Sequence, residues 1–276
     1  MIKAKEIISH MESLRDDRQR TILMRFFKTG PGDYGEGDDF LGLKVPQTRD
    51  VVKMVGKDTD LSEVPQLLMS EWHEVRLCGL LLMVEKFERL TTKRLIHDEK
   101  ATKKRDEILS MYLQYAERAS NWDLVDLSAP KILGHWLLLP TLLAGRDSSE
   151  EEMRTYKKTT LDALADSQNL WRQRMSIVCT WKTSQAGDAS WCLRYAERHL
   201  SHPHDLMHKA VGWMLREMGK RVSMDLLRDF LRQHVQNMPR TTLRYAIEKM
   251  DAEERAYWMS LDRQERDFNS KNVELI

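Results

Sequence analysis

The feature that most constrains this chain is a helical period of apolar residues that recurs from Pro46 to the C-terminus. Apolar side chains return every three or four residues, and no stretch shows the sustained alternation that is typical of a strand. Capping residues and prolines separate the periodic stretches. We therefore predict an all-α fold. The predicted helices cover residues 46–56, 62–70, 72–89, 98–119, 121–138, 149–166, 169–184, 188–200, 204–220, 222–236, 239–250 and 252–262.

A short pattern recurs along these helices. Residues 72–76 can be laid over residues 122–126, and further copies centre on Arg174, Lys209 and Arg244. A small or apolar helical run follows each copy, and the copies are spaced at intervals of roughly 35 to 50 residues. This pattern is similar to HEAT repeats, in which antiparallel helix pairs stack into an array. The sequence thus predicts a curved superhelical solenoid whose second helices line the concave face.

The N-terminal part differs from this pattern. Residues 3–29 predict two amphipathic helices, the second with an apolar stripe that includes Ile22 and Phe26. Residues 30–39 are rich in Gly and acids, lack the GK[ST] ending of a phosphate-binding loop, and predict an inserted loop. We expect one HEAT-like-repeat domain over residues 1–276, with this loop and a C-terminal extension after about residue 252.

Composition limits where the protein acts and what it binds. With 44 Lys and Arg against 43 Asp and Glu, the formal net charge is +1, so any basic surface must be local. No apolar run is long enough to span a membrane, and the N-terminus has no cleavable apolar segment. The three cysteines have no CxxC spacing. We expect buried thiols and a cytoplasmic protein without a membrane partner.

The segment after Ser120 carries the strongest candidate site. Ser120 or Asn121 can cap a helix that begins near Trp122, with Asp123 in the first turn where an anion is favoured. Because residues four apart share a helix face, Trp122 and Asp126 lie one above the other. An aromatic face beside a carboxylate suits a flat, positively charged ligand.

The central position of the repeated pattern is occupied by a cation in four of its five copies: Arg76, Arg174, Lys209 and Arg244. These side chains could form a row that follows a phosphate backbone, or they could pair with acids of neighbouring repeats. Asp126 is the exception. An acid near polyanionic DNA would repel phosphate, so we expect either paired burial or a cationic ligand at this position.

Four ordered motifs over roughly residues 3–250 resemble the AlkD-like DNA glycosylases, the enzymes with HEAT-like repeats that excise alkylated bases. The motifs are FLGLKVPQTR at 40–49, NWDLVD at 121–126, LWRQRMSI at 170–177 and HKAVGWMLRE at 208–217. By motif, Trp122 and Asp126 match the family's catalytic aromatic and carboxylate, and Trp213 its second cleft tryptophan. Arg174 matches the cleft arginine, and we expect it to hold flanking phosphates together with Lys209. Phe26 stands where the best-known members carry tyrosine.

The resemblance implies a monofunctional N-glycosylase of base excision repair. Its substrates would be cationic lesions such as N3-methyladenine and N7-methylguanine in double-stranded DNA, with no metal and no redox cofactor. It also implies that the enzyme works without drawing the lesion into a closed pocket. We expect a monomer that is nucleoid-associated when it binds DNA.

Other interpretations remain open at the level of sequence. The same scaffold could be a non-catalytic module that binds distorted or branched DNA, or a protein-binding solenoid. Trp136, Trp181 and Trp258 are expected to be packing residues. A metal site is a further alternative, but it has no HExxH motif and no partner cysteine, and Pro203 interrupts it. Its residues would be His199, His202, His204 and His208.

Overall fold

The computed structural model describes residues 1–141 and 149–261, and within these ranges the chain is helical, without a β-strand. The predicted all-α fold is confirmed. A short helical stretch also covers residues 252–261, and the expected C-terminal extension beyond residue 261 lies outside the described residues. The helices are α1 (Ala4–Ser13), α2 (Asp17–Phe26), α3 (Val45–Val55), α4 (Val64–Leu68), α5 (His73–Arg89), α6 (Glu99–Gln114), α7 (Trp122–Ser128), α8 (Leu133–Leu138), α9 (Glu150–Ala165), α10 (Leu170–Val178), α11 (Thr180–Gln185), α12 (Ser190–Arg198), α13 (Asp205–Arg221), α14 (Met224–His234) and α15 (Arg240–Ala246).

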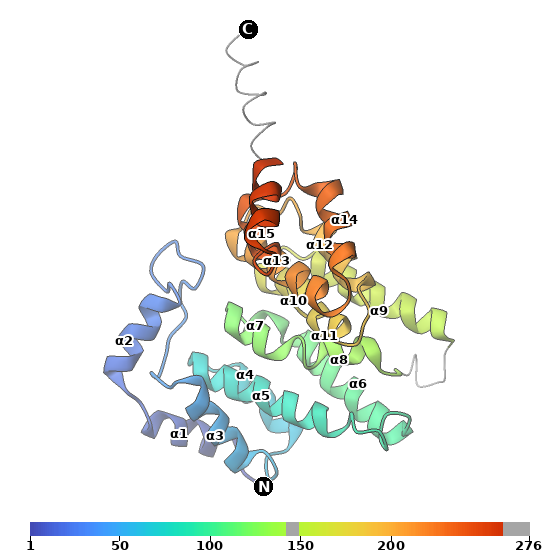
Figure 1. Cartoon of the computed structure of the whole chain (residues 1–276). Coiled ribbons are helices and arrows are strands. Elements are labelled where there is room, and N and C mark those ends of the chain that lie inside the picture. The colour runs from blue at the N-terminus through green and yellow to red at the C-terminus, as the bar shows by residue number, and fades with distance from the viewer. Residues whose placement is uncertain (142–148, 262–276) are drawn as a thin grey trace.

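The five helices that carry the repeated pattern form one continuous stack. α5 packs against α7, α7 against α10, α10 against α13, and α13 against α15. Figure 1 shows the chain winding from α1–α5 at the base, through α7 and α8, to α13–α15 at the top. Helix partners close in the chain cover this stack, as α4 covers α5 and α9 covers α10. The repeated sequence pattern therefore falls on helices that stack directly on one another.

Two glycines show how tightly neighbouring layers approach. A Cβ atom on Gly134 of α8 would lie 2.5 Å from the carbonyl oxygen of Cys179, beside α11. One on Gly212 of α13 would lie 2.4 Å from the carbonyl oxygen of Thr242 in α15. Because neither distance allows a side chain, glycine is required where these backbones meet.

Some predicted helices are shorter than expected. The segment 121–138 is not one helix: α7 ends at Ser128 and α8 begins at Leu133. Pro130 lies in the break, where its missing N–H and its ring oppose continuation of the helix. The segment 169–184 is likewise divided at Cys179, and 239–250 ends as α15 at Ala246.

The expected packing residues are largely in the core. Trp136 and Trp258 are buried, and Trp181 is partly buried with the guanidinium of Arg221 4.9 Å from its ring centre. The three cysteines, Cys78, Cys179 and Cys192, are free and buried, as predicted. No helix in the described ranges is long and apolar enough to cross a membrane.

Helix α2 does not pack as its apolar stripe suggests. None of its residues is buried, and Ile22 and Phe26 are 54% and 61% exposed. Two contacts hold its N-terminal end: the Asp16 side chain caps it, and Arg20 forms a 2.6 Å ion pair with Asp39. In Figure 1, α2 stands at the edge of the molecule.

Candidate active site

The start of α7 is fixed by Asn121, which is the cap that the sequence offered as one of two choices. Its side-chain oxygen accepts the N–H of Trp122 at 2.9 Å, and its amide nitrogen donates to Asp38 at 3.1 Å. Asn121 is fully buried. The cap therefore ties the first turn of α7, and with it Trp122 and Asp126, to the loop that precedes α3.

A buried ionic cluster lies beneath this helix start. The imidazole of His73 contacts Asp38 at 2.8 Å through Nδ1 and Asp123 at 3.0 Å through Nε2, and Arg76 pairs with Asp38. Burial alone would lower the pKa of His73, but the two carboxylates outweigh it and raise the pKa to about 9. His73 is thus positively charged at neutral pH, and its contacts join α5, α7 and the loop 30–39.

The segment directly after this loop, residues 41–43, is fixed by Glu74. Its carboxylate accepts three successive backbone N–H groups, those of Leu41, Gly42 and Leu43, at 2.8 to 2.9 Å. Gly42 has a φ of +94°, and a Cβ there would lie 2.1 Å from the carbonyl oxygen of Asp16. The predicted inserted loop is therefore anchored to the first turns of α5 and α7.

Asp126 and Arg174 form a two-point ion pair between α7 and α10. The Nε of Arg174 donates to Oδ1 of Asp126 at 2.9 Å, and Nη2 donates to Oδ2 at 2.8 Å. The Nη1 group donates to the carbonyl oxygen of Leu206 at 2.6 Å, so the guanidinium is fixed on both sides. The Asp126 side chain is 17% exposed, and it lines the cleft described below.

Two opposing effects act on the ionisation of Asp126. Burial raises the pKa of this carboxyl above its usual value, while the charge and hydrogen bonds of Arg174 lower it. The net result is a raised pKa. Arg174 thus limits the effect of burial and favours the ionised carboxylate.

Aromatic contacts orient the indole of Trp122. Its ring stacks on Phe27 at 5.2 Å between centroids, and the ring of Phe26 meets its face edge-on at 5.9 Å. Phe27 in turn stacks on Phe40 at 5.1 Å, and Phe40 stacks on His73 at 4.3 Å. The tryptophan is therefore the end of a row of rings that begins at the charged histidine.

All five predicted site residues line one open cleft of about 550 Å³. It is lined by residues from α7, α10 and α13, together with Tyr34 of the loop and Tyr245 of α15. Neither tyrosine was predicted from the sequence, although Tyr245 directly follows the pattern residue Arg244. The lining residues are Phe26, Tyr34, Trp122, Asp126, Arg174, Leu206, Lys209, Trp213, Arg216 and Tyr245.

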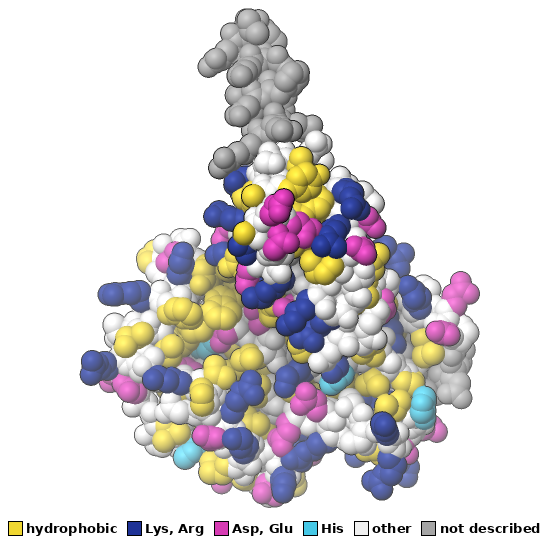
Figure 2. All heavy atoms as spheres, in the orientation of Figure 1, with side chains coloured by type: hydrophobic (Ala, Val, Ile, Leu, Met, Phe, Trp, Pro, Cys, Tyr) yellow, Lys and Arg dark blue, Asp and Glu magenta, His cyan; other side chains and the backbone are white. Residues whose placement is uncertain are grey.

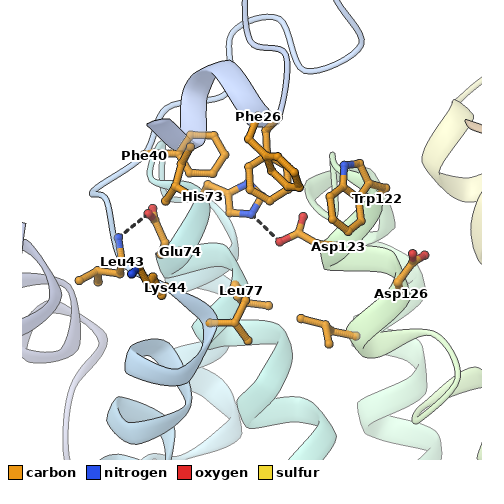
Figure 3. A pocket seen from close by; sticks show the side chains of 14 residues that line it. Phe26, Phe40, Leu43, Lys44, His73, Glu74, Leu77, Trp122, Asp123 and Asp126 are labelled. Carbon is orange, nitrogen blue, oxygen red and sulfur yellow. Dashed lines mark hydrogen bonds and ion pairs between the residues drawn. The ribbon is translucent and has the colours of Figure 1, made fainter. Parts of the chain in front are cut away.

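A second cavity of about 370 Å³ lies on the other side of Trp122. It is lined mainly by aromatic and aliphatic side chains from α2, the loop, α5 and α7, and it shares Phe26, Trp122 and Asp126 with the cleft. Figure 3 shows Asp123, bonded to His73, on its wall between His73 and Trp122. In Figure 2, hydrophobic side chains gather beside α2 on this face.

The predicted row of cations is only partly present. Arg76 is 3% exposed; it pairs with Asp38 and donates to the carbonyls of Ser70 and Glu71, so it belongs to the buried cluster and not to a DNA-facing surface. Lys209 lies in the cleft, 42% exposed and 2.7 Å from Asp205 on its own helix. The repeat register placed both residues on stacked helices, but it did not specify which of them reach solvent.

A comparison with family models decides the relationship of this chain to known proteins. The model of the DNA alkylation repair enzymes matches residues 7–250. The chain belongs to the DNA alkylation repair enzyme family. The suspected relationship is therefore confirmed, and membership supports a role in alkylation repair with DNA as the substrate. The match includes α2, α7, α10 and α13, which contribute to the cleft.

The fold of this family member is similar to that of a solved structure, described as a predicted DNA alkylation repair enzyme from Enterococcus faecalis. The two chains share 13% identity with a TM-score of 0.57, over 86% of this chain and 97% of the other. At this identity the likeness concerns the fold alone. No curated protein matches the sequence.

The four histidines considered as a metal site form hydrogen bonds within the protein, around the turn that leads into α13. His199, His202 and His204 lie between α12 and α13, His208 lies near the start of α13, and each imidazole has a protein partner. Across the described ranges, no group of three or more His, Cys, Asp or Glu side chains is placed to hold a metal ion. The partners are Ser176 for His199, Gln173 for His202, the N–H of Leu206 for His204, and the carbonyl of His202 for His208.

Proposed function

We propose that this family member is a monofunctional DNA glycosylase that hydrolyses the N-glycosidic bond of positively charged alkylated purines in duplex DNA. N3-methyladenine and N7-methylguanine are the substrates we expect, as the first step of base excision repair by a monomer. The observation that carries the proposal is the Asp126 carboxylate, partly open to the cleft between Trp122 and Trp213 and held at two points by Arg174.

The chemistry requires little more than a fixed negative charge. Alkylation at a ring nitrogen makes the base cationic, so it leaves with the electron pair of the C1′–N bond and becomes neutral. Positive charge then develops on the sugar, and a carboxylate held beside it stabilises that charge without having to reorganise. A water molecule that Asp126 orients attacks C1′ and loses a proton to bulk water, which leaves a hydroxyl group on C1′ of the abasic sugar.

Arg174 has two effects on this step. Its two-point contact fixes the plane of the carboxylate, and its charge opposes the rise in pKa that burial causes at Asp126. The cost is partial neutralisation of the carboxylate. In the proposed complex the sugar lies closer to the carboxylate of Asp126, which lines the cleft, than to the guanidinium of Arg174, so it still meets a negative field.

The remaining residues would bind the substrate. Trp122 and Trp213 offer ring faces to a cationic nucleotide at about 0.5 to 2 kcal/mol each. Lys209 would hold a flanking phosphate, exchanging its contact with Asp205 for the stronger charge of DNA. No metal or redox cofactor is needed in this scheme, because the leaving base already carries its own activating charge.

The direct test is to incubate wild-type protein with alkylated duplex DNA and to identify the products by chromatography. The proposal expects free methylated purines and intact strands that carry abasic sites. Tight binding without release of any base would instead support a non-catalytic module for distorted DNA. For a DNA-binding protein, the logarithm of the DNA affinity falls linearly with the logarithm of the salt concentration, with a slope of about 0.9 per phosphate contact. A DNA affinity that does not fall with salt would argue for a protein partner instead.

A further inference from the structure

Most of the outward face of α2 has no role in the scheme above. Ile22 is 54% exposed, and Phe26, one helical turn later on the same face, is 61% exposed. Arg18, one turn before Ile22, is exposed as well. These three side chains are spaced four residues apart and form one ridge on the helix surface, which we call the α2 ridge. Neighbouring large apolar side chains that remain exposed are typical of a binding surface.

The opposite face of α2 holds the helix against the rest of the protein. Arg20 pairs with Asp39 at 2.6 Å, and its Nε donates to the carbonyl oxygen of Phe40 at 3.0 Å. Residues two apart on a helix point in nearly opposite directions. Because Arg20 is turned toward the protein, Arg18 and Ile22 are turned toward solvent.

The charge of α2 favours an anionic partner. Residues 17–28 contain four Lys or Arg and one acid, although the whole chain has a formal net charge of only +1. Arg20 pairs with Asp39, whereas Arg18 and the exposed Arg25 have no ion-pair partner in the part of the chain that the structure describes. A guanidinium that no carboxylate neutralises can bind a phosphate with its full charge.

The α2 ridge is continuous with the cleft. Phe26 lines the cleft from α2, and residues of α13 and α15 line it from the other end of the helix stack (Figure 1). The eight positions from Arg18 to Phe26 span about 12 Å along a helix. This length corresponds to about three to four base pairs of B-DNA, which rise about 3.4 Å each. A duplex whose damaged nucleotide lies in the cleft can therefore extend over the α2 ridge.

We propose that the α2 ridge, with Arg25 beside it, is a second contact surface for duplex DNA, and that it binds the segment about three to four base pairs to one side of the lesion. The assignment rests on the proposed function, because it takes the same duplex as its partner. Arg18 and Arg25 bind phosphates of this segment, and Ile22 packs against its sugars. Apolar side chains make contacts of this kind in the minor groove. The surface binds undamaged DNA, so it adds affinity without selecting the base.

Fluorescence anisotropy with an undamaged duplex tests the surface without turnover. The double variant Arg18→Ala, Arg25→Ala should lower the slope of log affinity against log salt by about 1.8, the value for two phosphate contacts. Ile22→Ala removes an apolar contact and no charge, so it should weaken binding by about fivefold at an unchanged slope.

Two residues of and after α3 provide matched controls. Met54 is 55% exposed, close to the 54% of Ile22, and it lines neither the cleft nor the cavity beside Trp122. Lys57 is an exposed cation outside both sites. Met54→Ala and Lys57→Ala should bind DNA as the wild type does. Equal slopes for the wild type, the double arginine variant and Lys57→Ala would overturn the proposal.

A stable abasic-site analogue locates the surface relative to the lesion. With the analogue about two base pairs from the 5′ or the 3′ end of its strand, the duplex should be too short to reach α2 at one of the two ends. There the wild type and the double arginine variant should have equal slopes, and a difference that persists at both ends would overturn the placement. Weaker binding by the α2 variants of a protein that releases no base from alkylated DNA would support the surface and contradict the glycosylase function.

Discussion

Asp126 and Arg174 are joined by two parallel hydrogen bonds, of 2.8 and 2.9 Å, across the contact between α7 and α10. The two residues occupy equivalent positions in neighbouring copies of the repeated pattern, so the stacking of the repeats brings them face to face. One of them carries the charge that the proposed reaction needs, and the other controls how that charge is oriented and ionised.

This pair predicts a pH dependence. Only the ionised form of Asp126 can stabilise the sugar, so the rate of base release should fall as pH falls through the raised pKa of this carboxyl. Arg174→Gln removes the charge that opposes burial, so the pKa should rise further and the acidic limb should move to higher pH. The measurement is the single-turnover rate against pH. An acidic limb at the same pH in both proteins would show that this ion pair does not set the active ionisation state.

Lys209 predicts a change in salt dependence. Lys209→Ala should weaken DNA binding to all sequences and reduce the slope of log affinity against log salt by about 0.9, the value for one phosphate contact. Lys103→Ala is the matched control, because Lys103 makes a similar ion pair with Glu99 on its own helix but does not line the cleft. If the two variants have the same slope, Lys209 makes no contact with phosphate.

The activity is expected to depend on the aromatic ring at position 213. Trp213→Ala should lower kcat/KM for methylated DNA by about 2- to 30-fold, the equivalent of one cation–π contact, whereas Trp213→Phe should retain most of the activity. Trp181→Ala removes a tryptophan that lies outside the cleft and should leave the rate unchanged. Equal activity of the alanine and phenylalanine variants would assign Trp213 to packing.

His73 predicts how stability changes with pH. The pKa of its imidazole is about 9 in the folded protein and near 6.5 when unfolded, so its contribution is fully present below about pH 6.5 and is lost as pH rises to about 9. The contribution of this titration is about 3 kcal/mol. Urea unfolding at pH 6.5 and 9 should therefore show that wild type loses more stability than His73→Gln over this interval.

Exposed His97 supplies the control for this measurement. His97→Gln should follow the wild-type dependence on pH, because its side chain faces solvent. A His73→Gln protein with the same dependence as wild type would mean that the buried imidazole does not carry a proton in the folded state.

Local and periodic features of the sequence predicted much of the site. The spacing of Trp122 and Asp126 fixes their common face, and the register shared with Arg174 and Lys209 places all of them along one stack of helices. Arg76 has the same register but is buried, because an acid from a distant loop, Asp38, reaches it. Burial by a long-range contact leaves no periodic signal in the sequence.

The N-terminal part was the least predictable for the same reason. The apolar stripe of α2 indicated a packed helix, yet Phe26 is 61% exposed and lines the cleft. Tyr34 reaches the cleft from a loop whose path depends on Glu74 and on the buried cluster of His73. Such contacts join residues more than thirty positions apart and follow only from the folded structure.

The central claim is that the Asp126 carboxylate stabilises the developing charge on the sugar. It is tested most directly by the single-turnover release of methylated purines by wild type and Asp126→Asn, with DNA affinity measured on the same samples. The account predicts a rate about 100- to 1,000-fold lower in the variant, with DNA binding retained. Base release at the wild-type rate by Asp126→Asn would contradict it.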